Sequence, residues 1–116
     1  MSLSLARQTL LALSLALCTA PIAVRADTAP LIITFNDGLI TPQRLEVPKG
    51  TTVTVTVRNT GKTGAEFESK RLHKEKAVAP GAEIKVELRG LPAGEYEFVD
   101  EFHENLATAH GVIVAN

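Results

Sequence analysis

The densest group of side chains able to bind a metal lies in the run Asp100-Glu101-Phe102-His103-Glu104 and at His110. It supplies three carboxylates and two imidazoles within eleven residues. Oxygen and imidazole donors together suit iron, zinc, manganese or Cu(II), and suit Cu(I) less, because Cu(I) favours soft sulfur ligands. The competing interpretation is a solvated acidic loop, because Asp and Glu are usually exposed. The spacing therefore indicates a candidate metal site with a plain surface loop as its alternative.

Two further carboxylates, Glu66 and Glu68, flank Phe67 in a segment with the character of a strand. Side chains two residues apart in a strand point to the same face. Two like charges on one face repel each other, strongly if both are buried, and a cation between them or a Lys or Arg partner relieves the repulsion. His73 is a weaker candidate, because the charged stretch around it, residues 70–76, is typical of an exposed face.

Short apolar runs separated by turn signals must position these side chains. The clearest strand is predicted at residues 51–59, where three valines alternate with polar residues. Further extended segments are predicted at residues 30–35, 40–47, 65–68, 83–88, 95–99 and 111–114, with a helical turn only within 102–110. About seven short strands with Gly and Pro turns predict an all-β, Greek-key β-sandwich.

Residues 1–26 have the character of a cleavable signal peptide. Arg7 supplies a positive charge, and residues 10–17 form an apolar run that is too short to span a bilayer. Val24 and Ala26 stand at the two positions that a signal peptidase inspects. We therefore expect cleavage after Ala26, a mature domain of residues 27–116 and a periplasmic location.

The single cysteine, Cys18, lies inside this predicted signal. A lipoprotein acylated at Cys18 is the alternative, but Leu17 argues against it, because the residue before a lipidated cysteine is normally small. Cleavage after Ala26 leaves a mature domain without a thiol. Such a domain can form no disulfide, no cysteine nucleophile and no thiolate metal site.

Charge and composition argue against several classes of function. Of the 12 basic residues, Arg7 and Arg25 precede Asp27, so 10 basic and 13 acidic residues remain in the mature domain. That balance gives no basic patch for neutralising nucleic-acid phosphates. Ser69 is the only serine after Asp27 and has no nucleophile-elbow or triad context, which argues against a hydrolase.

Five motifs follow one another along the mature chain. The first is the Pro-x-Gly turn at 48–50 with its Val/Thr strand ending in Asn59, and the second is Glu66-Phe67-Glu68. The third is Glu-Lys-x-Val-x-Pro-Gly at 75–81, and the fourth is Leu-Pro-x-Gly-Glu-Tyr-x-Phe at 91–98. The last is the ligand-rich loop ending in Gly-Val-Ile-Val at 111–114. Their order resembles the cupredoxin-like domain, most closely the variety in bacterial periplasmic iron-uptake systems of the EfeO and FtrB type.

This resemblance implies a ligand set. Blue-copper cupredoxins use a His after the Asn-ended strand, then Cys, His and usually Met in the loop before the last strand. On that pattern Glu66 falls near the first His, Asp100 near the Cys, His103 at the second His and His110 near the Met, with Glu68, Glu101 and Glu104 as alternates. A blue-copper site is excluded without the thiolate, and carboxylates shift the preference toward Fe(II), Fe(III) or Cu(II).

The resemblance also implies a role. It predicts a periplasmic protein that binds copper, iron or both and assists ferrous iron uptake by iron binding, oxidation or electron transfer. Its partners would be the metal ion and other components of an uptake system, such as a membrane permease. The alternative is a non-catalytic interaction module that binds no metal and docks through residues 70–76. A metal site requires at least three of the ligands within about 2.0–2.6 Å of a common point.

Overall fold

Alternating apolar and polar residues form nine strands in the part of the chain that the computed structural model describes, which is residue 16 and residues 29–116. The predicted signal peptide, Cys18 and the cleavage point after Ala26 lie outside the described residues, apart from Ala16. Among the described residues, no helix is both long enough and apolar enough to cross a membrane.

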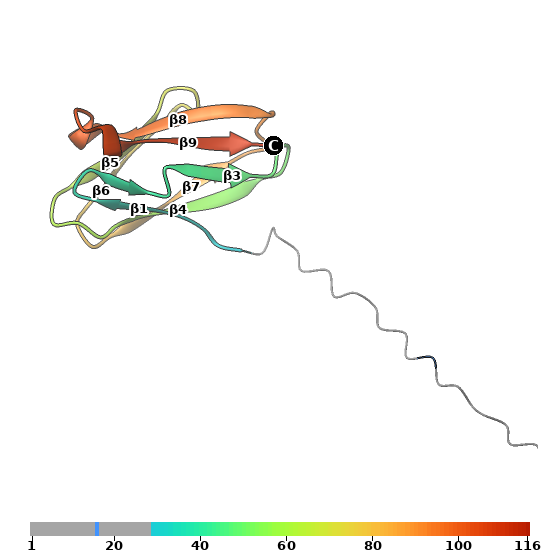
Figure 1. Ribbon diagram of the computed structural model, residues 1–116, viewed down its shortest axis with the longest axis horizontal. Helices are drawn as coiled ribbons and strands as arrows, with labels where there is room; N and C mark the ends of the chain where they lie inside the picture. Colours follow the sequence, from blue (N-terminus) through green and yellow to red (C-terminus); the bar gives the residue numbers. More distant parts are fainter. Residues whose placement is uncertain (1–15, 17–28) are drawn as a thin grey trace, which may run out of the picture.

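The strands form two facing sheets (Figure 1). The four-stranded sheet has the order β2-β1-β4-β7 and contains β1 (Leu31–Asn36), β2 (Leu39–Thr41), β4 (Val53–Asn59) and β7 (Glu83–Leu88). The five-stranded sheet has the order β3-β9-β8-β5-β6 and contains β3 (Arg44–Val47), β5 (Ala65–Ser69), β6 (Lys74–Val78), β8 (Gly94–Asp100) and β9 (His110–Ala115). The predicted all-β sandwich is confirmed, with nine strands rather than about seven.

Two predicted segments differ from the structure. The extended arm at 40–47 is split into β2 and β3, which belong to different sheets, because Ile40 and Val47 are both buried and anchor the two ends separately. The charged stretch at 70–76 leads into the edge strand β6, where Lys76 Nζ donates a hydrogen bond to the Lys85 carbonyl of β7. A charge that points inward on an edge strand hinders pairing with another chain.

Three stacked phenylalanines form the centre of the core between the sheets. The ring centroids of Phe67 and Phe98 are 5.2 Å apart, and each lies 6.4 Å from the ring of Phe35. Gly111 faces Phe98 across β8 and β9, and a Cβ on it would lie only 2.5 Å from Phe98 Cζ. This packing holds β5 and β8 together next to the end of β8, where the residues that could bind a metal follow.

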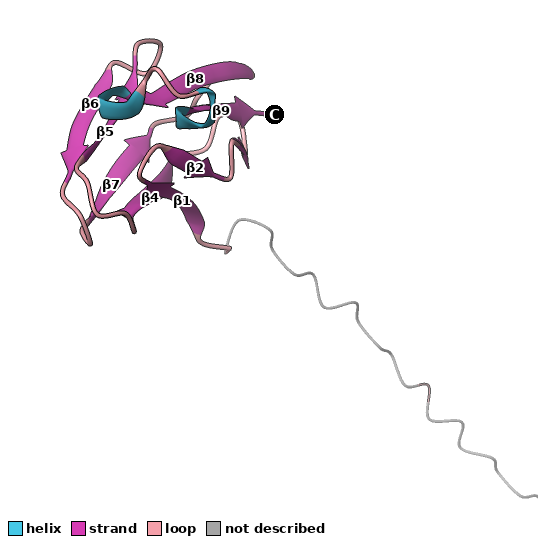
Figure 2. Cartoon of the chain, turned by 60° about the vertical axis from the view of Figure 1, so that its left-hand side comes forward, coloured by secondary structure: helices cyan, strands magenta, loops and turns pink. Residues whose placement is uncertain are grey.

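The loop between β8 and β9 folds into two short 3-10 helices, η2 (Glu101–His103) and η3 (Ala107–Ala109) (Figure 2). They replace the single helical turn predicted within 102–110. η2 lies against β5, and η3 lies against β2 of the other sheet. The loop therefore spans both sheets at one end of the sandwich, and it carries three of the seven candidate ligands, Glu101, His103 and Glu104.

Candidate metal site

Strand register determines which carboxylates meet at this end of the sandwich. Glu66 and Glu68 lie on the same face of β5, as the alternation predicted, and because Phe67 between them is buried, this is the outer face. The β5–β6 register sets Glu75 opposite Glu68. β8 pairs with β5 at Phe67 and Asp100, so η2 starts at the next residue, beside β5.

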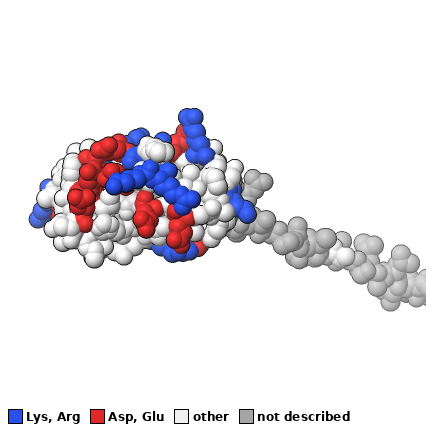
Figure 3. Space-filling view, turned by 90° about the horizontal axis from the view of Figure 1, so that it is seen from above, with Lys and Arg blue, Asp and Glu red and all other residues white. Residues whose placement is uncertain are grey.

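The result is a group of three carboxylates, Glu66, Glu75 and Glu101, here called the carboxylate group. One carboxylate oxygen from each lies within 4.8 Å of the others. Lys74 and Lys76 flank Glu75 but lie on the opposite face of β6 by strand alternation. Among the ion pairs of residues 29–116, none includes a member of the group. Figure 3 shows acidic side chains gathered on the molecular surface beside a run of basic ones.

Crowding of like charges changes the acid–base chemistry of this group. Hydrogen bonding with Glu75 and Glu101, partial desolvation and their negative charges raise the pKa of Glu66 to about 7. Desolvation, followed by the charges of Glu101 and Glu75, raises the pKa of Glu68 above its ordinary value. A carboxyl that holds a proton near neutrality because of its neighbours can exchange that proton for a cation.

Asp100 and His103 lie together but are engaged in hydrogen bonds with the protein. Asp100 is fully buried, and its Oδ1 accepts the backbone N–H of Glu66 at 3.0 Å, while its Oδ2 lies 2.7 Å from His103 Nδ1. His103 Nε2 lies 3.1 Å from Thr63 Oγ1, which donates to Asp37 Oδ1 at 2.7 Å. Both carboxylate oxygens and both ring nitrogens therefore have partners within the fold.

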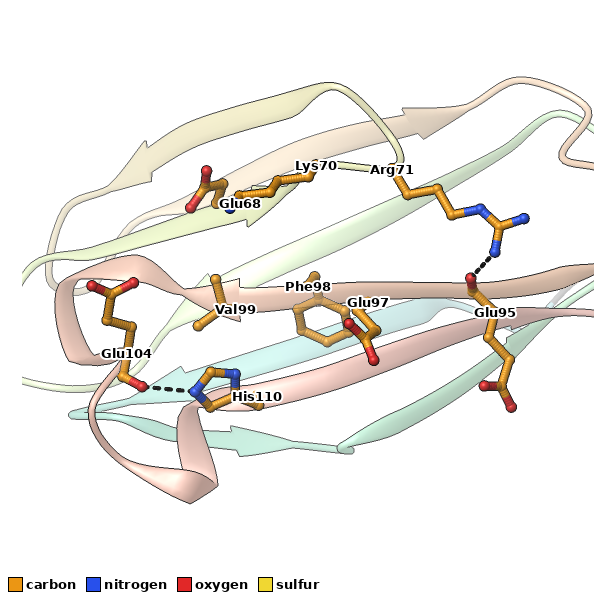
Figure 4. Close-up of a pocket in the computed structure, with 9 residues that line it drawn as sticks. All are labelled: Glu68, Lys70, Arg71, Glu95, Glu97, Phe98, Val99, Glu104 and His110. Carbon is orange, nitrogen blue, oxygen red and sulfur yellow. Dashed lines mark hydrogen bonds between the residues drawn. The ribbon is translucent and has the colours of Figure 1, made fainter.

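His110 lies apart, in an open groove of about 610 Å³ on the outer face of the five-stranded sheet (Figure 4). Its Nε2 lies 2.7 Å from the Glu104 main-chain oxygen, and Glu68 and Glu104 line the same groove. The structure thus separates the predicted set of Glu66, Asp100, His103 and His110, since no three of these have ligand atoms within 4.8 Å of one another.

Sequence reasoning identified two members of the carboxylate group and missed the third. Glu66 was a predicted ligand and Glu101 an alternate, but Glu75 lay in a stretch interpreted as an exposed face. The sequence did contain a signal for the strand β6, because the apolar Val78 ends it after alternating charges. Pairing that segment with residues 65–69 as a hairpin would have set Glu75 beside Glu68.

Comparison with known proteins identifies a matching family model and one sequence relative. The family model for the cupredoxin-like domain matches residues 8–115. An uncharacterised protein of Rickettsia prowazekii (strain Madrid E) is 40% identical over 84 residues, which cover 72% of this chain and 66% of the relative. The chain therefore spans slightly less than two thirds of that relative.

Solved structures share the fold at low identity. The purple cupredoxin of Nitrosopumilus maritimus has a TM-score of 0.58 at 19% identity, covering 74% of this chain and 99% of that one. Auracyanin of Roseiflexus castenholzii has a TM-score of 0.59 at 15% identity, covering 75% and 96%. The metal-binding domain of a Cu(I)-exporting P-type ATPase of Streptococcus pneumoniae D39, solved with Cu(I), has a TM-score of 0.59 at 12% identity, covering 81% and 91%. From its fold and its family match, this chain belongs to the cupredoxin-like domain family.

Proposed function

We propose that this protein binds a hard or borderline transition-metal cation, Fe(II), Fe(III) or Cu(II), through Glu66, Glu75 and Glu101. The observation that carries the proposal is the convergence of three carboxylates from β5, β6 and η2 without a basic partner among the described ion pairs. Bond lengths of about 2.0–2.6 Å allow two oxygens on one cation to lie up to about 5 Å apart. The three carboxylate oxygens lie within 4.8 Å of one another, which is inside that limit.

The side-chain atoms available as ligands determine which metal could bind here. A blue-copper centre needs a cysteine thiolate and two histidines, usually with an axial methionine. The only cysteine is Cys18 and the only methionine is Met1, so residues 29–116 supply neither sulfur ligand. Blue copper does not fit these residues. Carboxylate oxygens fit harder cations, and Cu(II) remains compatible with them.

The biological role that we propose is assistance to ferrous iron uptake in the periplasm. It is supported by the predicted signal peptide of residues 1–26, by the resemblance of the motif order to uptake systems of the EfeO and FtrB type, and by an all-oxygen group suited to iron. Carboxylate ligands stabilise the ferric state more than the ferrous state, so bound iron would be easier to oxidise. Partners would be other components of the uptake system, including a membrane permease.

Metal titration of the purified protein tests this function. Fe(II) under anaerobic conditions, Cu(II) and Zn(II) are each titrated by calorimetry into the wild type, Glu75→Gln and the control Glu97→Gln. Glu97 is exposed on the same sheet and lies outside the carboxylate group. We expect stoichiometric binding that weakens at least tenfold in Glu75→Gln and is unchanged in the control. Equal binding by all three proteins would disprove the assignment of the site.

A second candidate, an interaction module that binds no metal, is favoured by exposed apolar side chains. Phe102 is 57% exposed and Leu106 is 42% exposed, one on either side of His103 and Glu104 in the β8–β9 loop. Large apolar side chains exposed at one place are typical of docking surfaces. Absence of binding for all three metals in the titration would favour this candidate. If iron binds, oxygen consumption on adding Fe(II) then distinguishes an oxidase from a metal donor.

A further inference from the structure

One continuous series of hydrogen bonds crosses the end of the sandwich that carries the β8–β9 loop. It starts at the Glu66 backbone N–H, passes through Asp100 to His103 Nδ1, and continues from His103 Nε2 to Thr63 and then Asp37. No described side-chain nitrogen or oxygen that is fully buried lacks a hydrogen-bond partner. The fully buried atoms of the series therefore all have hydrogen-bond partners within the protein.

This series joins elements that are far apart in the sequence. Asp37 lies in the turn between β1 and β2 of the four-stranded sheet, and Asp100 ends β8 of the five-stranded sheet. Thr63 lies in the loop between β4 and β5, and Asp37 Oδ1 also accepts the backbone N–H groups of Lys62 and Thr63 at 2.9 and 3.0 Å. The two sheets are thereby connected through polar side chains at the end where their core packing stops.

Steric contacts bring the same segments together. Gly38 has a φ of +88°, and a Cβ on it would lie 2.5 Å from Leu106 and 3.1 Å from the His103 side chain. Thr108 Oγ1 donates to the Gly38 carbonyl at 2.8 Å. The β1–β2 turn and the β8–β9 loop are therefore in direct contact around His103, and the polar series lies within a packed junction.

We infer that Asp37, Thr63, His103 and Asp100 form a metal-free clamp that joins the two sheets at the place where the family pattern sets its copper ligands. Asp100 and His103 correspond to the Cys and second-His positions of that pattern, yet each of their polar atoms is used by the fold. In this chain hydrogen bonds therefore perform the cross-linking that a metal would perform there. Asp100 and His103 are positioning residues, and they are not ligands.

The clamp has a consequence for the neighbouring carboxylate group, and this part rests on the proposed metal binding. Asp100 holds the backbone of Glu66 and is followed directly by Glu101. The clamp thus fixes two members of the group before any cation arrives. A cation would meet carboxylate oxygens only, which favours hard ions over Cu(I).

Denaturation of the metal-free protein tests the clamp independently of metal binding. Urea unfolding with a chelator present compares the wild type with Asp100→Asn, His103→Asn and the double variant. We expect each single variant to raise the unfolding equilibrium constant about tenfold or more, and the double variant to add little beyond the worse single one, because the two residues form one interaction. Fully additive effects, or no loss in either single variant, would overturn the clamp.

A milder variant keeps the test decisive if Asp100→Asn does not fold. Thr63→Val removes the hydroxyl between His103 and Asp37 in an exposed loop. Its expected effect is a severalfold rise in the unfolding constant of the metal-free protein. An unchanged unfolding constant would show that the Thr63 hydroxyl does not connect the clamp to the four-stranded sheet, and it would overturn the inference.

Zinc titration followed by imidazole ¹⁵N NMR separates a positioning residue from a ligand. We expect the His103 ring nitrogens to keep their shifts at saturating Zn(II), whereas a ligand nitrogen would move to a metal-bound shift. In addition, Asp100→Asn should weaken Zn(II) binding by about tenfold without changing the stoichiometry, as for other residues that orient ligands. Movement of the His103 resonances to metal-bound shifts would contradict the inference. If Zn(II), Fe(II) and Cu(II) all fail to bind, the proposed function fails, while the denaturation result still decides on the clamp.

Discussion

The clamp and the carboxylate group are neighbours in space, but they differ in how their charges are balanced. In the clamp, the fully buried Asp100 carboxylate has a hydrogen-bond donor for each oxygen and an imidazole beside it. In the carboxylate group, Glu66 faces two further acids, and its pKa is raised to about 7 in consequence. The first arrangement is complete within the protein. The second lacks a basic partner among the described ion pairs and, in our proposal, takes up a cation, so the comparison contrasts a structural cluster with a proposed binding cluster.

The largest expected effect comes from removing the Asp100 carboxylate from the clamp. Asp100→Ala leaves the Glu66 N–H and His103 Nδ1 without their buried partner, and each buried polar group left without a hydrogen bond costs about 1–3 kcal/mol. We therefore expect the free energy of unfolding of the metal-free protein to fall by about 3 kcal/mol, measured by urea denaturation. The exposed control Glu97→Ala should change it by less than about 0.5 kcal/mol. A similarly small loss of stability in Asp100→Ala and Glu97→Ala would show that the clamp stabilises the fold no more than an exposed side chain does.

Adding a cation should stabilise the carboxylate group and leave the clamp unaffected. A ligand at 100 times its dissociation constant adds about 2.7 kcal/mol to the free energy of unfolding if it binds the folded state only. We expect a gain of that order for the wild type with Zn(II). Glu75→Gln should lose most of this gain, while Thr63→Val should keep it. The measurement is urea denaturation with and without zinc, and a gain preserved in Glu75→Gln would contradict the assignment.

A smaller effect is expected at the solvent-exposed end of the clamp. A single hydrogen bond contributes about 0.5–1.5 kcal/mol to stability, so Thr63→Val should cost about 1 kcal/mol. The Thr63 hydroxyl is also the largest of the interactions that lower the pKa of Asp37, followed by the backbone N–H groups of Thr63 and Lys62. The variant should therefore raise the pKa of Asp37 toward its ordinary value, which a carboxyl-carbon NMR titration measures. Thr54→Val, exposed on β4, is the matched control and should leave that pKa unchanged.

The dependence of stability on pH should be modest and should have the sign set by Glu66. Its pKa is about 7 in the folded state and near 4.5 without its neighbours, so the folded state binds the proton more tightly. The associated stabilisation is complete below pH 4.5 and is lost as the pH rises through 7. The free energy of unfolding of the wild type should therefore fall relative to that of Glu66→Gln between pH 5 and pH 8.

Two carboxyls with lowered pKa values leave that pH test unaffected, whereas Glu68, whose pKa is raised, contributes with the same sign as Glu66. The pKa values of Asp37 and Glu83 are lowered, by hydrogen bonds from Thr63 and from Arg58 respectively, so their stabilising effect is lost only as the pH falls below their ordinary values. Between pH 5 and pH 8 they remain ionised in both folded proteins. A constant difference between wild type and Glu66→Gln over this range would show that the three carboxylates do not interact.

Local patterns in the sequence predicted most of the fold. Alternation placed Val55 and Val57 in the core and identified β7 with the bounds that the structure has. The division of 40–47 into two strands and the strand β6 were not predicted, for one physical reason, namely that all three strands are edge strands. The arm at 40–47 divides between two sheet edges, and β6 exposes three of its five residues, so neither carries the apolar alternation of a central strand.

The candidate site was predictable only in part. Glu66 and Glu101 could be named from their residue types, whereas Glu75 depended on recognising β6. Asp100 and His103 were named as ligands because carboxylate and imidazole are metal donors. Their burial and their hydrogen bonds to Glu66 and Thr63 are long-range properties that residue type does not contain.

By itself, the sequence determined the chemistry that is available. It specifies a β-rich domain after a predicted signal peptide, with no sulfur ligand in residues 27–116 and with many carboxylates near one loop. The tertiary structure decided which of these side chains meet. The β5–β6 register and the pairing of Phe67 with Asp100 bring Glu66, Glu75 and Glu101 together and direct Asp100 into the interior. The physical reason is that convergence depends on strand pairing between distant segments, where a shift of one residue turns every side chain to the opposite face.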